Sequence, residues 1–264
     1  MIERHAVVLT AYNQVEQQHN LTVQTVESIL KQDIGPLDLL LIDNGSTVRG
    51  TWEHFEMLRE MYTAEGSETR IHTKQFKENW SPVKIANCSM AYMWRLGHGK
   101  ILGVSNDVIL PANFYRLADE FPRGIICGSM TEQLDFPTFE KASAMNECTP
   151  MAVALVRKWA YDALVAKDGY FFDENFFLYA SDCDFALRIA ACGIRGVQLD
   201  VQYWHHGSAH WRLLDQEAGR RETSKADVDR AYFVSKWGFP VTAYEYGACA
   251  ADINFRGKGK AVGA

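Results

Sequence analysis

The chain has 264 residues, 47% hydrophobic and 23% charged, and 33 acidic against 27 basic residues give a formal net charge of −6. This composition is typical of a soluble globular protein, and the length allows a full α/β core. The acidic balance argues against a generic nucleic-acid-binding protein, and no apolar run approaches the roughly 18 residues of a membrane span. The six cysteines include no C-x-x-C pair and no signal peptide is visible, so we expect reduced thiols and a cytoplasmic location.

Repeated strand–helix units are predicted in the first 110 residues. Apolar residues at helical spacing predict three helices, and short apolar runs predict four strands. The run at 37–42 is almost wholly apolar, as in a strand buried on both faces, so a parallel sheet is favoured. The predicted strands lie at 6–9, 37–42, 71–73 and 100–104, and the helices at 21–30, 52–62 and 86–96.

The second half is predicted to complete the sheet and to wall a cleft. Its patterns indicate strands at 124–127 and from 197–199 toward 207, and helices at 152–165 and 181–192. The polar stretch 130–150 is either a loop over the site or a hairpin. Trp159 is expected in the core. The basic residues Arg220, Arg221 and Lys225 and those at 256–260 are expected on a solvated helix face and in a frayed terminus.

We therefore expect one α/β domain over 1–264, with a Rossmann-like, mostly parallel central sheet flanked by helices. Residues 1–110 would form the nucleotide-binding half, 111–240 the acceptor and catalytic half, and 241–264 a C-terminal tail. Ligands of open α/β sheets bind beyond the carboxyl ends of the strands.

Three segments carry residues suited to chemistry. Asp107 follows an apolar run and precedes a turn, where a carboxylate can hold a hard cation against a phosphate, although Asn-Asp before a proline is also ordinary turn chemistry. Asp182 begins a predicted helix, either as a cap or as a general base, and Asp184 and Arg188 have the spacing of an ion pair. His205 and His206 face opposite sides of a strand, so at most one points into a given site.

These fragments, taken in order, resemble the large family two of A-fold (GT-A) glycosyltransferases, the inverting enzymes that use nucleotide sugars. The resemblance runs from residue 6 to about residue 240. It is carried by seven segments: Val7–Asn13, Leu40–Thr47, Asn79–Asn87, Ser105–Asp107, Ser181–Asp184, His205–Ala209 and Tyr232–Gly238. Ala11 stands where the family often has proline, and Ser81 stands where it has glycine. Ser105 and Ser181 replace acids of the metal-binding and catalytic motifs.

The resemblance implies a role for each matched position. Asp182 inherits the role of general base, and Asp107 and His205 that of ligands to Mn²⁺ or Mg²⁺. The donor, a nucleoside-diphosphate sugar with a UDP-sugar favoured, would contact Thr10, Ala11, Tyr12, Asp43, Lys84, Asn87, Ser105 and Asn106.

The implied reaction transfers a sugar to an acceptor hydroxyl in one inverting displacement. The acceptor stays open between a saccharide, a lipid-linked glycan, a protein and a hydroxymethylated nucleic acid. Two other functions compete with this hypothesis. One is a non-catalytic nucleotide- or glycan-binding protein on the same scaffold, which the two serine replacements favour. The other is a nucleotidyltransferase, which the missing basic glycine-rich loop disfavours.

Overall fold

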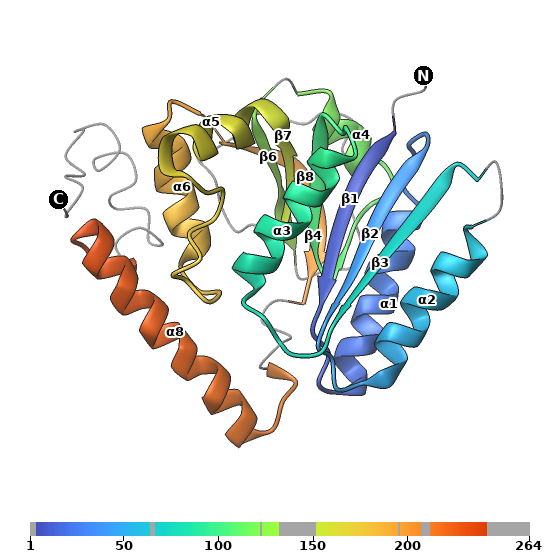
Figure 1. Ribbon diagram of the computed structural model, residues 1–264, viewed down its shortest axis with the longest axis horizontal. Coiled ribbons are helices and arrows are strands. Elements are labelled where there is room, and N and C mark those ends of the chain that lie inside the picture. Colours follow the sequence, from blue (N-terminus) through green and yellow to red (C-terminus); the bar gives the residue numbers. More distant parts are fainter. Residues whose placement is uncertain are drawn as a thin grey trace.

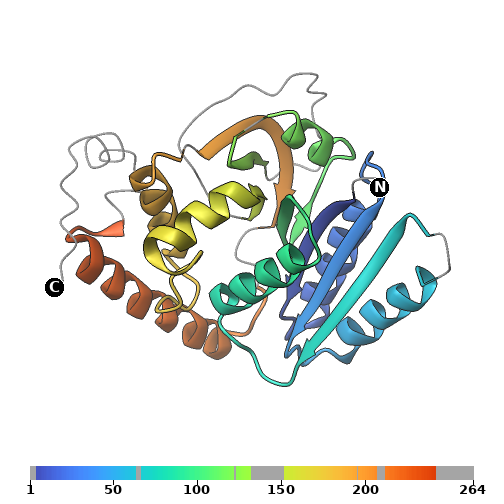
Figure 2. The ribbon, with the colours of Figure 1, turned by 45° about the horizontal axis from the view of Figure 1, so that its top comes forward.

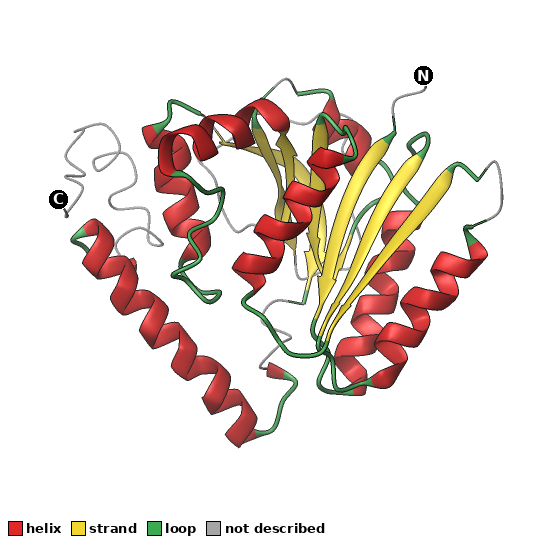
Figure 3. Cartoon of the chain, viewed as in Figure 1, coloured by secondary structure: helices red, strands yellow, loops and turns green. Residues whose placement is uncertain are grey.

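The computed structural model describes residues 4–63, 67–121, 123–131, 152–194, 196–206 and 212–241. Its centre is an eight-stranded sheet in the order β3-β2-β1-β4-β7-β6-β8-β5. The strands are β1 (His5–Ala11), β2 (Leu37–Asn44), β3 (Thr69–Phe76), β4 (Lys100–Ser105), β5 (Val108–Ile109), β6 (Ile125–Thr131), β7 (Val153–Arg157) and β8 (Gly196–His205). Figure 1 shows the sheet between two layers of helices, and Figure 3 shows the same view by element type.

The first four strands of this order are parallel, as predicted. β7 is antiparallel to both of its neighbours, β6 and β8 are parallel to each other, and β5 pairs antiparallel with β8. Four of the seven neighbouring pairs are therefore parallel, which confirms a mostly parallel sheet.

Helices cover both faces of the sheet (Figures 1 and 2). On one face lie α1 (Glu16–Leu30), α2 (Arg49–Met61) and α4 (Phe114–Asp119). On the other lie α3 (Pro82–Arg95), α5 (Lys158–Asp168), α6 (Ser181–Ala191) and α8 (Gln216–Trp237). Among the described residues, no helix is both long enough and apolar enough to cross a membrane.

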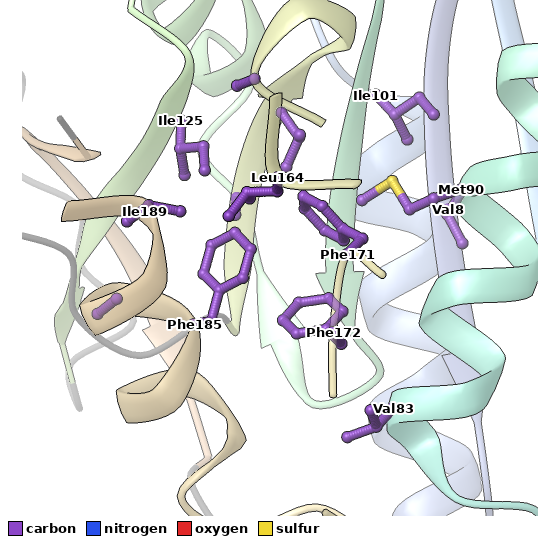
Figure 4. Packing of buried hydrophobic residues seen from close by; sticks show 14 of the residues in the cluster. Val8, Val83, Met90, Ile101, Ile125, Leu164, Phe171, Phe172, Phe185 and Ile189 are labelled. Carbon is purple, nitrogen blue, oxygen red and sulfur yellow. The ribbon is translucent and has the colours of Figure 1, made fainter. Parts of the chain in front are cut away.

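The core has one part on each side of the sheet because the inner strands alternate between the two faces. Val7 and Leu9 pack toward α1 and α2, whereas Ala6 and Val8 pack toward α3. On the second face, an aromatic cluster joins α5 and α6 to the sheet. Figure 4 shows Phe171, Phe172 and Phe185 of this cluster together, with Leu164 and Ile189 beside them.

Two predictions for the second half are wrong. The segment predicted as one helix over 152–165 forms strand β7 and then helix α5. The segment begins with a short apolar run that is partly β-branched, and the periodicity of such a run does not distinguish a strand from a helix. Pairing with β4 and β6 makes this run a strand. Trp159, expected in the core, is 52% exposed. Helix α4 was not predicted, and neither was the helical extent of α8.

Candidate nucleotide and catalytic site

The strand ends predicted to bind the nucleotide lie side by side. Thr10 of β1 pairs with Ile42 of β2 and with Ser105 of β4, and Ala11 pairs with Asp43. Tyr12 follows directly after β1. Because these three strands are parallel, the loops that follow them emerge at one edge of the sheet.

The turn after β2 is built around Asp43, which is 1% exposed. One carboxylate oxygen accepts the Ser46 N–H at 2.9 Å, and the other accepts a hydrogen bond from Gln75 at 3.1 Å. Gly45 has φ +79°, and a Cβ there would lie 2.5 Å from the backbone of Glu78. A glycine is therefore required for this turn to pack against the 78–79 segment.

A buried amide network ties together the loops after β1 and β4. The side chain of Asn13 is fully buried and donates to Thr22 and Thr51, each at 3.0 Å. The Asn106 side-chain amide donates to Asn13 Oδ1 and to the Thr22 hydroxyl, also at 3.0 Å. Asn106 is thus directed toward α1, so its side chain stabilises the edge of the site.

Asp107 and His205 meet directly. His205 Nε2 lies 3.2 Å from Asp107 Oδ1, and the His206 N–H donates to the Asp107 carbonyl at 3.0 Å. The antiparallel pairing of β5 with β8 brings about this contact, because Val108 is the partner of His205. Thr25 of α1 accepts the Val108 N–H and fixes the strand behind Asp107.

This pair supplies one carboxylate oxygen, which suits Mn²⁺ or Mg²⁺, and one imidazole nitrogen, a ligand more typical of transition metals, which favours Mn²⁺ of the two. Within the described residues, no group of three or more His, Cys, Asp or Glu side chains forms a metal site. The residues therefore fit an ion whose remaining ligands come from diphosphate oxygens or water. The His206 ring lies edge-on to the Trp204 ring, and its Nδ1 is buried without a hydrogen-bond partner.

Lys84 and Asn87 both lie on α3, yet their surroundings differ. Lys84 is exposed near the start of the helix. Asn87 accepts the Phe172 N–H at 2.9 Å and donates to the Phe172 carbonyl at 2.9 Å and to Glu174 at 3.0 Å. Its amide thus holds the 172–174 segment, and its predicted contact with the diphosphate stays a prediction.

Asp182 lies in the first turn of α6, and the residue that precedes this helix has an unusual backbone conformation. Ala180, the residue before the helix, has φ 57°, the only positive φ of a non-glycine residue in the described ranges. Such conformations cost about 1–3 kcal/mol and cluster at functional sites. Burial raises the pKa of the Asp182 carboxyl, although the Cys183 N–H, which donates to it at 2.9 Å, acts in the opposite direction.

A path of hydrogen bonds links the predicted nucleotide-binding edge to the segment before Asp182. Asn44 of β2 donates to the Trp80 carbonyl at 2.8 Å and accepts the Trp80 N–H at 3.0 Å. The next residue, Ser81, donates to the Phe177 carbonyl at 2.7 Å. The site residues of β2 and α6 are thus connected through residues 79–81.

Helix α8 contributes Asp229, which the sequence analysis missed. Its carboxylate is 1% exposed and accepts three successive backbone N–H groups, of Phe177 at 2.8 Å, Leu178 at 2.9 Å and Tyr179 at 2.7 Å. The available signal was an acid on the apolar face of a helix, between Ala226 and Phe233. Asp229 therefore fixes the segment that leads into Ala180.

Lys236 of α8 joins two buried acids behind α6. Its ammonium lies 2.6 Å from Asp173 and 2.7 Å from Asp184. Burial would lower the pKa of Lys236, but the two carboxylates raise it above its usual value. Arg188 also contacts Asp184 at 3.0 Å, which confirms the ion pair predicted from their spacing.

Several predicted segments lie outside the described residues. These are the 207–209 part of the His205 motif, nearly all of 130–150, the basic tail at 256–260, and Cys148 and Cys249. No disulfide joins the four described cysteines.

No family model and no curated protein matches the chain in sequence. Solved structures do match its fold. Residues 1–349 of S. aureus TarS align with a TM-score of 0.56 at 15% identity, covering 95% of this chain and 76% of that one. The complex of this fragment with UDP aligns with a TM-score of 0.56 at 16% identity, covering 93% of this chain and 75% of that one. The complex with UDP-GlcNAc aligns with a TM-score of 0.55 at 16% identity, covering 95% of this chain and 77% of that one. The chain spans 44% of the longer TarS structure. The chain therefore has the α/β fold of these TarS structures, which is of the GT-A type.

Proposed function

We propose that the protein is a glycosyltransferase that moves a sugar from a nucleoside-diphosphate sugar, with a UDP-sugar favoured, to an acceptor hydroxyl with inversion. One observation carries the proposal. The strand-end loops and the Asp107–His205 pair share one edge of a fold whose relatives are structures of TarS with UDP and UDP-GlcNAc.

The donor nucleotide would lie over the ends of β1, β2 and β4. Thr10, Ala11 and Tyr12 would contact it there, with Asp43 on the neighbouring strand and Ser105 and Asn106 on the far side. Lys84 and Asn87 would lie toward the diphosphate. Asp43 is held rigidly by its two hydrogen bonds, so its position is prepared before the nucleotide arrives.

Asp107 and His205 would hold Mn²⁺ or Mg²⁺. When bound, the ion supplies positive charge beside the leaving diphosphate. The direct contact of these side chains, from elements almost 100 residues apart in sequence, supports this assignment.

Asp182 would act as the general base that accepts the proton of the attacking hydroxyl. A raised pKa favours this role, because a carboxylate with a higher proton affinity takes the proton of the attacking hydroxyl more readily. The left-handed backbone at Ala180 and the three bonds to Asp229 fix where α6 begins, and hence where Asp182 lies.

A thermal-shift panel tests the donor site with UDP, GDP, TDP and CDP, each with Mn²⁺ or with chelator, on wild type and Asp107→Ala. A ligand at about a hundred times its Kd adds roughly 2.7 kcal/mol, which raises the Tm by several degrees. We expect a metal-dependent rise with UDP that Asp107→Ala abolishes. No rise with any nucleotide would contradict the donor site.

Turnover separates the enzyme from a non-catalytic binding protein on the same scaffold. We expect Asp182→Asn to lower kcat by about 10²-fold or more while nucleotide binding is retained. Near-wild-type turnover by this variant would exclude Asp182 as the base. Binding of UDP without transfer or hydrolysis of any UDP-sugar would favour the non-catalytic binding protein. Ser105 and Ser181, which replace acids of the metal-binding and catalytic motifs, support this alternative.

A further inference from the structure

A cavity of about 320 Å³ lies beside α3, against β2 and β3. β3 is the edge strand of the sheet, and Figure 1 shows β2 and β3 extending beyond α3. None of the residues predicted to bind donor or metal, or to act as the base, lines this cavity. It is therefore separate from the site described above.

The walls of the cavity are mostly apolar. Leu40 and Ile42 of β2 form its floor with Ile85 of α3, and Phe76 and Tyr92 supply aromatic rings. Ligand cavities of about 300–1,000 Å³ with apolar walls and a few polar groups are the usual binding sites for small molecules. At the small end of this range, the cavity suits a single substituted ring.

His72 lines the cavity with an imidazole ring that also contacts Tyr92. Its Nδ1 lies 3.3 Å from the Tyr92 hydroxyl, whereas its Nε2 is buried without a partner. Burial lowers the pKa of His72, so the ring is neutral at neutral pH. His72 is therefore a neutral part of the wall.

Two cations, Lys74 and Arg95, line the cavity without a carboxylate partner among the described residues. The Lys74 ammonium lies 5.4 Å from the centre of the Phe76 ring, and Arg95 Nε donates to the Ala91 carbonyl at 3.2 Å. Residues 69–96 contain five basic residues and one acid, although the whole chain has a net charge of −6. The segment from β3 to α3, which lines most of the cavity, therefore carries a net positive charge.

We propose that this cavity binds a small aromatic anion, a single apolar ring that bears a carboxylate or a phosphate. The ring packs against Ile85, Phe76 and Tyr92, and the anionic group lies toward Lys74 and Arg95. The proposal does not depend on the transferase activity, because it uses other residues.

Cys88 provides a direct test, since its exposed thiol lines the cavity. The rate of its alkylation by iodoacetamide is measured by peptide mass spectrometry over a millimolar series of phenyl phosphate, benzoate or neutral benzyl alcohol. The partly exposed Cys192 is the internal reference. We expect one or both anions to slow alkylation of Cys88 about threefold or more, with no effect on Cys192. A threefold slowing corresponds to a free anion concentration of about twice the Kd, at which roughly one third of the cavities stay empty. The more effective anion identifies the head group.

In the double variant Lys74→Gln/Arg95→Gln, the anion concentration needed for the same protection of Cys88 should rise about fivefold or more. Lys77→Gln is the matched control, because Lys77 is an exposed cation nearby that does not line the cavity. Absence of protection by either anion would overturn the proposal. So would equal protection by benzyl alcohol, or unchanged affinity in the double variant.

Discussion

Lys236 of α8 lies 2.7 Å from Asp184 of α6, and the same ammonium lies 2.6 Å from Asp173. The two carboxylates are 1% and 3% exposed, so their charges are compensated mainly by protein groups. This contact joins the last described helix to the helix that carries Asp182.

Replacement of Lys236 by methionine should destabilise the fold. It leaves two buried carboxylates without this cation, and breaking a buried pair costs about 3–5 kcal/mol. Because Lys236 is partly exposed, we expect about 2 kcal/mol, measured as the shift of the urea unfolding midpoint at pH 7.

Lys31→Met is the matched control, since Lys31 pairs with Glu27 on the surface of α1 and its side chain is 71% exposed. Its cost should stay below about 0.5 kcal/mol. Similar costs for the two variants would show that Lys236 does not compensate buried charge.

Asp182→Asn should make the protein more stable while it lowers kcat. A raised folded-state pKa means that the folded protein binds the Asp182 proton more tightly than the unfolded chain does. Wild type therefore loses stability as the pH rises from the unfolded-state pKa of Asp182 to its folded-state pKa. The variant lacks this loss. Its stability advantage should therefore be near zero at about pH 4 and grow toward pH 7.

Chemical unfolding of both proteins across this pH range measures the difference. An advantage that shrinks as pH rises would contradict the raised pKa. The same pKa predicts that kcat falls on the acid side at a pH above the ordinary value for an aspartate, because protonation removes the base.

Asp229→Asn should lower kcat more than it changes the KM for the donor. An amide can accept at only one of its two terminal atoms, so the three backbone bonds to 177–179 cannot all persist. The segment before Asp182 would then lose its position, and misplacement of a catalytic group by about 1 Å can cost up to 10²-fold in rate.

Kinetics well below the Tm separate this effect from loss of folded protein. The control is Asp227→Asn on the same helix, because the Asp227 side chain is 82% exposed. If Asp229→Asn leaves kcat unchanged, or lowers it only in proportion to folded protein, Asp229 has a purely structural role.

Asn13→Ala should destabilise the fold and weaken nucleotide binding together. It removes the bonds to Thr22, Thr51 and Asn106 and leaves buried polar groups unpaired, for which we expect about 2 kcal/mol. The loops after β1 and β4 would lose their connection, so the Kd for UDP should rise. Asn20→Ala on the exposed face of α1 should change neither quantity. Unchanged UDP binding in Asn13→Ala would show that the network supports stability alone.

Local patterns in the sequence were enough to predict that the ends of β1, β2 and β4 lie together at one edge of the sheet. The strands around Val8, Leu40 and Leu102 are short apolar runs with polar loops at their ends, and parallel pairing brings these ends together whatever the rest of the chain does. The ion pair between Asp184 and Arg188 was equally predictable, because the two residues lie about one turn apart on the same face of one helix.

Contacts between distant segments could not be predicted in this way. The segment around Ala154 was ambiguous between helix and strand until β4 and β6 paired with it. Asp229 reads as one more polar residue of a charged helix, since its three partners lie about 50 residues earlier in the chain.

The sequence by itself determined which residues stand at the strand ends, because a strand and the turn after it are specified by neighbouring side chains. Only the tertiary structure decided that His205 meets Asp107, that Asn87 holds the 172–174 segment, and that α8 fixes the start of α6. The physical reason is that a buried polar group must find a partner. That partner is chosen by the packing of the whole chain rather than by its neighbours in sequence.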